Sequence, residues 1–330
     1  MLNGLIVLNE HAFELIYGSE LYAEIARRVH LVAPPQTGAT LQADSSILRD
    51  VDVIFSGWGA PLMDEAFLAA APRLRVVFYG AGTIRGFVTD AFWAREIVVT
   101  SAYAANAVPV SEYTVAAILF SLKHGWRFAL GTKRLGRFPE HTVAPGAYGT
   151  RVGLISLGTI GRLVRERLRP FDLHVSVHDP FLTAAQAKQL DVQAASLEEV
   201  FQTCDVVSLH APWLKETEGM IKARHFEVMK PGATFINTAR GAIVQEDDLI
   251  RVFQQRPDLT AVLDVTHPEP PAPDSPLFTL PNVVLTPHIA GSSDRECRRM
   301  GRLMIDEFER WIRGEPLKWS ISRERAAIMA

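Results

Sequence analysis

The feature that most constrains this chain is a short apolar run followed at once by a glycine turn and an amphipathic segment. Val152 to Leu157 is long enough for a buried parallel strand, and Gly158 and Gly161 open a segment with apolar residues at helical spacing. A strand, a tight turn and a helix start form an anion site, because free amides and the positive end of the helix dipole face one point. A complete dinucleotide fingerprint, G-x-G-x-x-G, has a glycine where this chain has Ser156. The same Gly-x-x-Gly spacing also occurs where a helix merely packs closely on a sheet.

The next expected strand supports the dinucleotide interpretation. His174 to His178 alternates toward Asp179-Pro180, and Asp179 lies 18 residues after Gly161. A carboxylate at the tip of the second strand can accept hydrogen bonds from both ribose hydroxyls of an adenosine, and it would repel a 2′-phosphate. The pattern therefore favours NAD over NADP. The alternative is a turn-forming aspartate before a proline.

Length and composition exclude several classes of protein. The chain has 330 residues, enough for two domains, and its formal net charge of −3 gives no reason to expect nucleic acid or an anionic membrane as a partner. The two cysteines, Cys204 and Cys297, fall in no metal-binding spacing, so we expect reduced thiols and no metal. The first residues lack the basic region of a signal peptide, and no uncharged apolar stretch is long enough to cross a bilayer. We therefore expect a soluble, cytoplasmic α/β protein.

Short apolar runs alternate with helical patterns over the first hundred residues. Strands are expected at 5–8, 29–33, 51–55 and 74–79, and helices at 21–28 and 63–71. This alternation indicates a parallel sheet covered on both faces, whose ligands collect beyond the carboxyl ends of the strands. The loops 56–61 and 80–83 are therefore candidates for holding a carboxylate on glycine backbone amides, and Trp58 for closing over an apolar substrate tail. The alternatives are ordinary glycine turns and a core tryptophan.

The middle of the chain contains a second unit of the same kind. A helix is expected over 109–124, with Pro109 in its first turn, and strands over 206–209, 234–237, 261–265 and 283–285. Residues 125–150 have no clear period and are interpreted as a connector, an arm reaching a partner subunit, or a long surface loop. An amphipathic helix over 293–313 is long enough to cross back and pack on the first domain.

Three polar segments follow the last three expected strands, and they contain Arg240, Glu269 and His288. Arg240 has a rigid fork that can hold a carboxylate with two parallel hydrogen bonds. His288 can exchange a proton with a hydroxyl or carbonyl oxygen near neutral pH, and Glu269 can orient the imidazole and favour its cation. Taken singly, these are ordinary residues: a surface arginine, a solvated glutamate and a histidine satisfied in a turn. Asp264 could cap a turn or hydrogen-bond the nicotinamide end of the cofactor.

At these segments the sequence resembles the D-isomer-specific 2-hydroxyacid dehydrogenase family, which includes phosphoglycerate, glyoxylate and hydroxypyruvate dehydrogenases or reductases. The match runs almost continuously from about Val99 to Gly291, through 204–212 and 229–233, and is weaker before it. The resemblance implies an α/β fold with two doubly wound parallel-sheet domains. These are a flavodoxin-like substrate domain of residues 1–102 plus 293–330 and an inserted Rossmann NAD-binding domain of residues 103–292. It also implies a homodimer, with 125–150 as the dimerisation arm.

The resemblance further implies roles for individual residues. Arg240 would anchor the substrate carboxylate, with His288 as acid/base and Glu269 as its partner, while backbone at Thr159 and Ile160 would meet the pyrophosphate. The expected cofactor contacts are Gly158, Thr159, Ile160, Gly161, Asp179, Pro180, His210, Pro212, Thr217, Thr238, Ala239, Arg240, Asp264, His288 and Gly291. The expected substrate contacts are Trp58, Ala81, Gly82, Arg240 and His288.

The chain departs from the family pattern in places. Ser156 replaces the first fingerprint glycine, and its side chain is small enough for cofactor binding to survive. Tyr79 to Arg85 follows the glycine pattern of the substrate loop but lacks the Asn/Asp pair that often comes next. Glu269, in place of an amide, argues against a formate dehydrogenase. With the sequence ending at Ala330, we expect no serine-sensing regulatory domain.

The function that the sequence favours is reversible hydride transfer between NAD and a small D-2-hydroxy acid or its 2-oxo acid. His288 would exchange the hydroxyl proton, and Arg240 would hold the carboxylate. One alternative is a non-catalytic NAD-sensing protein, as in corepressors that resemble this family. The other is an NADP-dependent 2-oxo acid reductase, which Asp179 disfavours.

Overall fold

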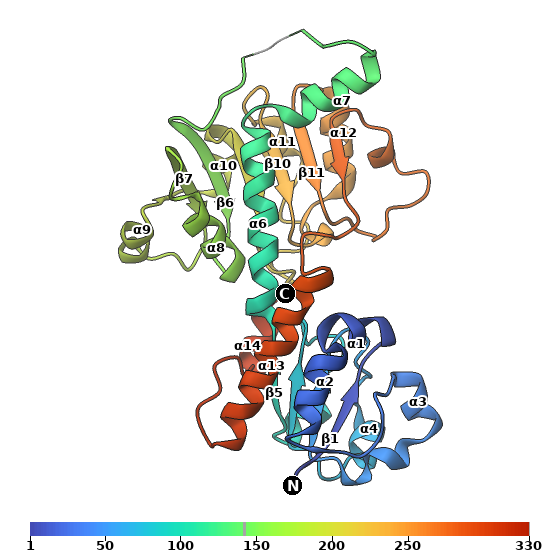
Figure 1. The fold of residues 1–330 in the computed structure, drawn as a ribbon. Coiled ribbons are helices and arrows are strands. Elements are labelled where there is room, and N and C mark those ends of the chain that lie inside the picture. Colours follow the sequence, from blue (N-terminus) through green and yellow to red (C-terminus); the bar gives the residue numbers. More distant parts are fainter. Residues whose placement is uncertain (141–142, 330) are drawn as a thin grey trace. The chain divides into compact units, whose positions relative to one another are not determined.

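The computed structural model describes residues 1–140 and 143–329, which fold into two α/β units (Figure 1). Unit 1 consists of Met1–Asn106 and Ser292–Ala330, and unit 2 of Ala107–Gly291. The chain leaves and re-enters unit 1 at neighbouring residues, since the Ser292 amide donates to Asn106 Oδ1 at 2.8 Å. The sequence-based boundaries, 102/103 and 292/293, differ from these limits by four residues and by one.

Unit 1 contains a five-stranded parallel sheet in the order β2-β1-β3-β4-β5, the order of flavodoxin-like folds. Its strands are β1 (Asn3–Val7), β2 (His30–Leu31), β3 (Val53–Ser56), β4 (Val76–Tyr79) and β5 (Val98–Ser101). Its helices are α1 (Glu10–Ile16), α2 (Gly18–Ala26), α3 (Gly38–Ala43), α4 (Glu65–Ala70), α5 (Asp90–Ala94), α13 (Cys297–Ile312) and α14 (Arg323–Ile328), with 3-10 turns at Ser45–Asp50 and Asp294–Glu296. Helix α6 (Tyr103–Ser121) begins in unit 1 and continues into unit 2.

The core of unit 1 follows from the two-residue period of its strands. Leu5 and Val7 of β1 belong to one buried cluster, and Ile6 and Leu8 belong to another. Because successive side chains of a strand point to opposite faces, the sheet is buried on both sides, as a parallel sheet requires. Figure 1 shows helices on both faces of this sheet.

Unit 2 contains a seven-stranded parallel sheet in the order β12-β11-β10-β9-β6-β7-β8. Its strands are β6 (Thr150–Ile155), β7 (Leu173–His178), β8 (Gln193–Ala194), β9 (Val206–Leu209), β10 (Thr234–Asn237), β11 (Thr260–Leu263) and β12 (Val283–Leu285). Its helices are α7 (Gly125–Leu135), α8 (Thr159–Leu168), α9 (Ala184–Leu190), α10 (Leu197–Thr203), α11 (Ala223–Glu227) and α12 (Glu246–Gln255), with 3-10 turns at Gly241–Ile243 and Pro276–Phe278.

The strand order of unit 2 reverses between β6 and β9, so the crevice of a doubly wound sheet lies where these two strands end. The Rossmann order 3-2-1-4-5-6 is present here with one additional strand at the β12 edge. Both expected sheet types are therefore confirmed. The loops that matter for ligands are those after β6, β9, β10, β11 and β12.

Several expectations about individual elements were wrong. The long helix begins at Tyr103, so Pro109 lies inside α6 instead of in its first turn. Strands β5 and β8 were not expected, and β2 is only two residues long. The aperiodic stretch 125–150 contains helix α7 and the start of β6; its residues 141 and 142 lie outside the part that the structure describes.

Within the described ranges, no single helix is long and apolar enough to cross a membrane. Helices α6 and α7 meet that length and composition only as a pair, and they are bent by 67° at their junction.

Candidate active site

The glycine turn after β6 has the geometry that its fingerprint position demands. Ser156 adopts a left-handed backbone with φ of 78°, a conformation normally left to glycine, so the serine occupies the turn under backbone strain. A Cβ on Gly161 would lie 2.3 Å from the Ser156 carbonyl oxygen, and this explains why the third position must be glycine. A Cβ on Gly158 would meet nothing within 4 Å, so the space above its backbone is open.

Helix α8 begins at Thr159, and Gly158 caps it without any side-chain hydrogen bond. The first amides of the helix, including those of Thr159 and Ile160, therefore remain available to an anion in the open space above Gly158. This is the arrangement that a pyrophosphate requires, with small residues at the turn and a helix N-terminus behind them.

Asp179 follows β7 and is half-buried beside the glycine turn. Its Oδ2 accepts a hydrogen bond from the Leu157 amide at 2.6 Å, and its Oδ1 accepts from the Phe181 amide at 2.8 Å. The carboxylate is thus fixed against the turn, and each oxygen keeps capacity for a further donor such as a ribose hydroxyl. Of the two interpretations of Asp179, the structure shows the turn-forming contacts, and its role toward a ribose stays a prediction.

His210 follows β9 at the other side of the crevice. Its backbone amide donates to the Ile155 carbonyl at 2.8 Å, which places it beside the end of β6. The imidazole is buried, its Nε2 has no hydrogen-bond partner within the described part of the chain, and burial lowers its pKa to about 4. A buried polar atom without a partner at this edge fits a site that a ligand completes. Downstream, the Thr217 hydroxyl donates to the Pro212 carbonyl at 2.5 Å and holds that turn.

Arg240 follows β10 in a segment that is fixed by the side chain of Asn237. Asn237 accepts from the Ala239 amide at 3.0 Å and donates to the Arg240 carbonyl at 3.1 Å. The Arg240 side chain is half-buried, and its Nη1 donates to the Ala239 carbonyl at 2.6 Å. A Cβ on Gly241 would lie 2.0 Å from the Thr266 backbone carbon, so glycine is needed for this segment to pack against the one after β11. Thr238 is also anchored, because its hydroxyl lies 3.1 Å from that of Thr114.

His288 and Glu269 form a close pair. His288 Nδ1 lies 2.6 Å from Glu269 Oε1, and both side chains are partly exposed, at 46% and 41%. A carboxylate on Nδ1 selects the tautomer with the proton on that nitrogen and leaves Nε2 to exchange a proton elsewhere. This is the orientation that a general acid–base histidine needs.

Asp264 holds the turn that carries His288. The Asp264 carboxylate is buried, with 2% of the residue exposed. Its Oδ1 accepts hydrogen bonds from the Thr286 hydroxyl at 2.6 Å and from the Ile289 amide at 2.9 Å. Its Oδ2 accepts a hydrogen bond from the Ala290 amide at 2.8 Å. The His288 amide donates to the Asp264 carbonyl at 2.9 Å, while His288 itself is left-handed with φ of 54°. Of the two interpretations of Asp264, the structure shows the turn-capping contacts.

Two residues that the sequence did not suggest extend this network. The Tyr113 hydroxyl lies 2.9 Å from Thr286 Oγ1, and because Thr286 donates to Asp264, Tyr113 is the donor to Thr286. Burial raises the pKa of Tyr113, and the nearby Asp264 adds to that rise. Tyr113 belongs to α6 and Thr286 follows β12, so no local motif links them.

Arg240, Glu269 and His288 follow three adjacent parallel strands, β10, β11 and β12. The three strands end side by side, because their last residues are paired: Asn237 with Leu263, and Leu263 with Leu285. The predicted convergence at one sheet edge is thus present in the topology, and the His288–Glu269 contact is direct. Gly291 is the last residue of unit 2.

The expected substrate contacts Trp58, Ala81 and Gly82 belong to unit 1. Trp58 is half-buried and packs against the apolar clusters of that unit. The Ser101 hydroxyl donates to the Ala81 carbonyl at 2.9 Å and also contacts the Gly82 carbonyl, which fixes the loop after β4. Ala81 is fully buried and Gly82 is half-buried, and the hydrogen bonds found among the described residues use neither of their amides.

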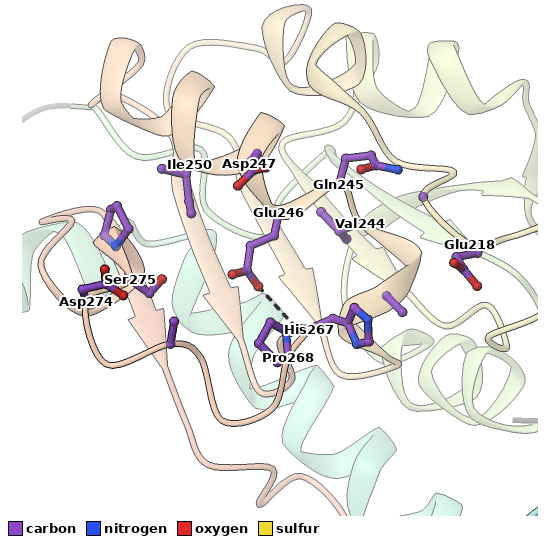
Figure 2. A pocket seen from close by; sticks show the side chains of 14 residues that line it. Glu218, Val244, Gln245, Glu246, Asp247, Ile250, His267, Pro268, Asp274 and Ser275 are labelled. Atoms are coloured by element: carbon purple, nitrogen blue, oxygen red, sulfur yellow. Dashed lines mark hydrogen bonds between the residues drawn. The ribbon is translucent and has the colours of Figure 1, made fainter.

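A cavity of about 550 Å³ lies in unit 2 beside the segment between Asp264 and Glu269 (Figure 2). Glu246 Oε2 accepts from the His267 amide at 3.2 Å, and Glu218, Asp247 and Asp274 also line the cavity. None of the expected cofactor or substrate contacts lines it. Among the described residues, no group of three or more His, Cys, Asp or Glu is arranged to hold a metal ion.

Together, the reversed strand order and the glycine turn define an α/β protein of the dinucleotide-binding class. Comparison with known proteins makes this class more specific. The chain belongs to the D-isomer specific 2-hydroxyacid dehydrogenase family, whose NAD binding domain matches residues 116–290. Both the resemblance and NAD as the cofactor of this domain are thereby confirmed.

Individual relatives agree with this assignment. The chain is similar to D-3-phosphoglycerate dehydrogenase of Mycobacterium bovis (31% identity over 283 residues, 84% of this chain and 51% of the relative). It is similar to (S)-sulfolactate dehydrogenase of Chromohalobacter salexigens (32% over 250 residues, 75% of this chain and 81% of the relative). The chain spans about half the length of the curated phosphoglycerate dehydrogenases that it matches.

Among solved structures, the chain is similar to D-lactate dehydrogenase of Aquifex aeolicus in complex with NAD and lactic acid. The identity is 25%, the TM-score is 0.72, and the alignment covers 95% of this chain and 96% of that one.

Proposed function

We propose that this chain catalyses reversible hydride transfer between NAD and a small D-2-hydroxy acid or its 2-oxo acid. The observation that carries the proposal is the 2.6 Å contact between His288 and Glu269 at the edge where Arg240 also emerges. In oxidation, His288 Nε2 takes the hydroxyl proton, and Glu269 stabilises the resulting imidazolium through Nδ1. In reduction, the protonated His288 returns that proton to the ketone oxygen.

NAD supplies the hydride acceptor when it is bound. The residues suited to hold it are the amides after Gly158 for the pyrophosphate, Asp179 for the ribose and His210 at the crevice. Asp179 is fixed by the Leu157 and Phe181 amides, and its negative charge would repel a 2′-phosphate on a ribose bound there. This supports NAD over NADP.

Substrate binding is assigned to Arg240 and to the loop after β4. Arg240 anchors the substrate carboxylate with its fork, and the amides of Ala81 and Gly82 offer a second set of donors. Trp58 closes over an apolar substituent. Replacing Arg240 by Lys retains the charge and removes the fork, so we expect a weaker and less well oriented substrate complex.

The test is turnover of a panel of 2-oxo acids with NADH and with NADPH. Glyoxylate, hydroxypyruvate and larger 2-oxo acids are assayed in reduction, and 3-phosphoglycerate and (S)-sulfolactate, suggested by the relatives, in oxidation with NAD. His288→Ala should lower kcat by roughly 10²–10⁴-fold, because the proton acceptor is lost. A near-normal rate in that variant would remove His288 from the role. NADH binding without turnover of any acid would identify a non-catalytic NAD sensor instead.

The proposal includes a homodimer formed through the stretch 125–150. Helix α7 and the residues after it expose large apolar side chains, with Leu135 at 45%, Phe138 at 84% and Tyr148 at 86%. Exposed apolar side chains that gather in a patch mark protein–protein contacts, so these residues are the ones we assign to the dimer interface. Analytical ultracentrifugation of the intact chain and of a Leu135→Glu/Phe138→Glu variant tests it: a dimer that persists in the variant contradicts this assignment.

The free thiols of Cys204 and Cys297 support the cytoplasm as the site of the reaction.

A further inference from the structure

The segment after α13 is built into the sheet of unit 1. Residues 319–321 run antiparallel along β5, with the Ser101 amide donating to the Trp319 carbonyl at 3.1 Å and the Ile321 amide to the Val99 carbonyl at 2.9 Å. Ile321 is 4% exposed and belongs to the core cluster that contains Ala81 and Ile84. The segment therefore closes the β5 edge of the sheet.

A buried carboxylate anchors the start of this segment. Glu307 of α13 is 1% exposed and accepts hydrogen bonds from the Lys318 amide at 3.2 Å and the Trp319 amide at 2.9 Å. Burial of a charge is costly unless hydrogen bonds compensate it, so these contacts define the path of the chain. The Trp319 ring lies edge-on to Tyr103, with the ring centres 5.6 Å apart.

Helix α14 then reaches the substrate loop. Arg85, two residues after Thr83 of that loop, donates from Nε to the Ala326 carbonyl at 3.3 Å and from Nη2 to the Ala327 carbonyl at 2.7 Å. The last carbonyls of a helix have no partner within the helix, so a cation there both caps them and complements the dipole. Arg325 of α14 contacts the Tyr103 hydroxyl and lies over its ring at 5.2 Å, and Ala326 packs against the cluster of Ala81 and Ile84.

The loop is consequently held at two points. Ser101 binds the carbonyls of Ala81 and Gly82, and Arg85 ties the other end to α14. We propose that Arg85 is a positioning residue and that the segment 318–329, acting through it, sets the placement of the Ala81 and Gly82 amides and so the selection among 2-oxo acids. This inference rests on the proposed function, which assigns those amides to the substrate carboxylate.

The matched control is Arg95, another arginine of unit 1 that caps a helix. Its Nη1 donates to the Leu68 and Ala71 carbonyls at 2.6 and 3.0 Å, at the end of α4. Arg85→Ala and Arg95→Ala thus remove the same kind of contact, and only the first lies on the substrate loop. Arg85→Lys retains a single charged donor.

The experiment measures KM and kcat for a small and a large 2-oxo acid, NADH affinity, and hydrogen exchange of residues 80–85. Arg85→Ala should raise KM about tenfold for at least one acid with kcat and NADH affinity within about twofold, because the loop loses both charged hydrogen bonds that tie it to α14. Exchange at 80–85 should accelerate, Arg85→Lys should lie between, and Arg95→Ala should match the wild type in both readouts.

Unchanged KM and unchanged exchange at 80–85 in Arg85→Ala would overturn the inference. An equal rise of KM in Arg95→Ala would do so as well, because it would attribute the effect to general destabilisation. If the wild-type protein turns over no 2-oxo acid, the proposed function fails, and the exchange data alone decide whether Arg85 holds the loop.

Discussion

At the scale of single residues, the most informative position is Ser156. Its φ of 78° costs a residue with a Cβ about 1–2 kcal/mol. A glycine would relieve this strain, but part of the gain in stability would be offset because glycine makes the unfolded chain more flexible. We expect Ser156→Gly to raise the free energy of unfolding by about 0.5–1 kcal/mol, measured by urea denaturation. Gly161→Ala is the opposing control and should destabilise, because its Cβ would collide with the Ser156 carbonyl. Loss of stability in Ser156→Gly would show that the serine side chain is itself stabilising.

His210 makes stability depend on pH. Burial lowers its pKa to about 4, below the ordinary 6.5, so between these values the unfolded chain binds more protons than the folded one. The contribution of His210 is complete above pH 6.5 and is lost as the pH falls toward 4. Between pH 7 and 5 the wild type should lose on the order of 2 kcal/mol more than His210→Gln, measured by urea unfolding at each pH. Parallel loss in the two proteins would mean that His210 is not buried as a neutral group.

At the scale of elements, Asp264 joins the end of β11 to the turn after β12. An asparagine offers one acceptor oxygen to three donors, the Thr286 hydroxyl and the Ile289 and Ala290 amides. Asp264→Asn should lower the free energy of unfolding by about 1–3 kcal/mol and lower kcat, because His288 depends on this turn. Thr286→Ser retains the donor and should behave like the wild type. Full activity of Asp264→Asn would separate the turn from the chemistry.

The elements also show what the sequence could and could not predict. Strands β9, β10 and β12 were predicted with their observed ends, and the site residues follow such strand ends, where parallel topology itself brings side chains together. Strand β5 was missed because it ends in Thr100 and Ser101, two polar residues that are fully buried and so conceal an apolar pattern.

Other misses have equally physical causes. The preference of proline for the first turn of a helix depends only on its neighbours in the chain. Helix α6 nevertheless continues through Pro109, because packing buries residues on both sides of it, such as Ala105 and Ile118. Helix α7 has only Gly131 buried and therefore no apolar stripe to recognise. The contacts of Asp264 and Tyr113 join residues far apart in the chain, and such pairs leave no periodic trace.

At the scale of the whole molecule, the two cofactors should differ in how much they stabilise the protein. A ligand at 100 times its Kd adds about 2.7 kcal/mol to the free energy of unfolding. We expect NADH to raise Tm and to protect amides at 155–161 and 178–181, and NADPH at the same concentration to do neither, because of Asp179. Gly158→Ala fills open space without a collision, so this variant should fold normally and lose the NADH effect. Equal shifts with both cofactors would contradict the NAD preference.

The hydrogen bond between Ser292 and Asn106 has an architectural consequence. Unit 2, residues 107–291, is an insertion whose two ends join unit 1 at neighbouring residues. The two segments of unit 1 can therefore pack together without it. Cutting at those two places and joining them with a short linker should leave unit 1 with a continuous backbone. An exchange of the coenzyme-binding unit between relatives would therefore need only two junctions in the chain.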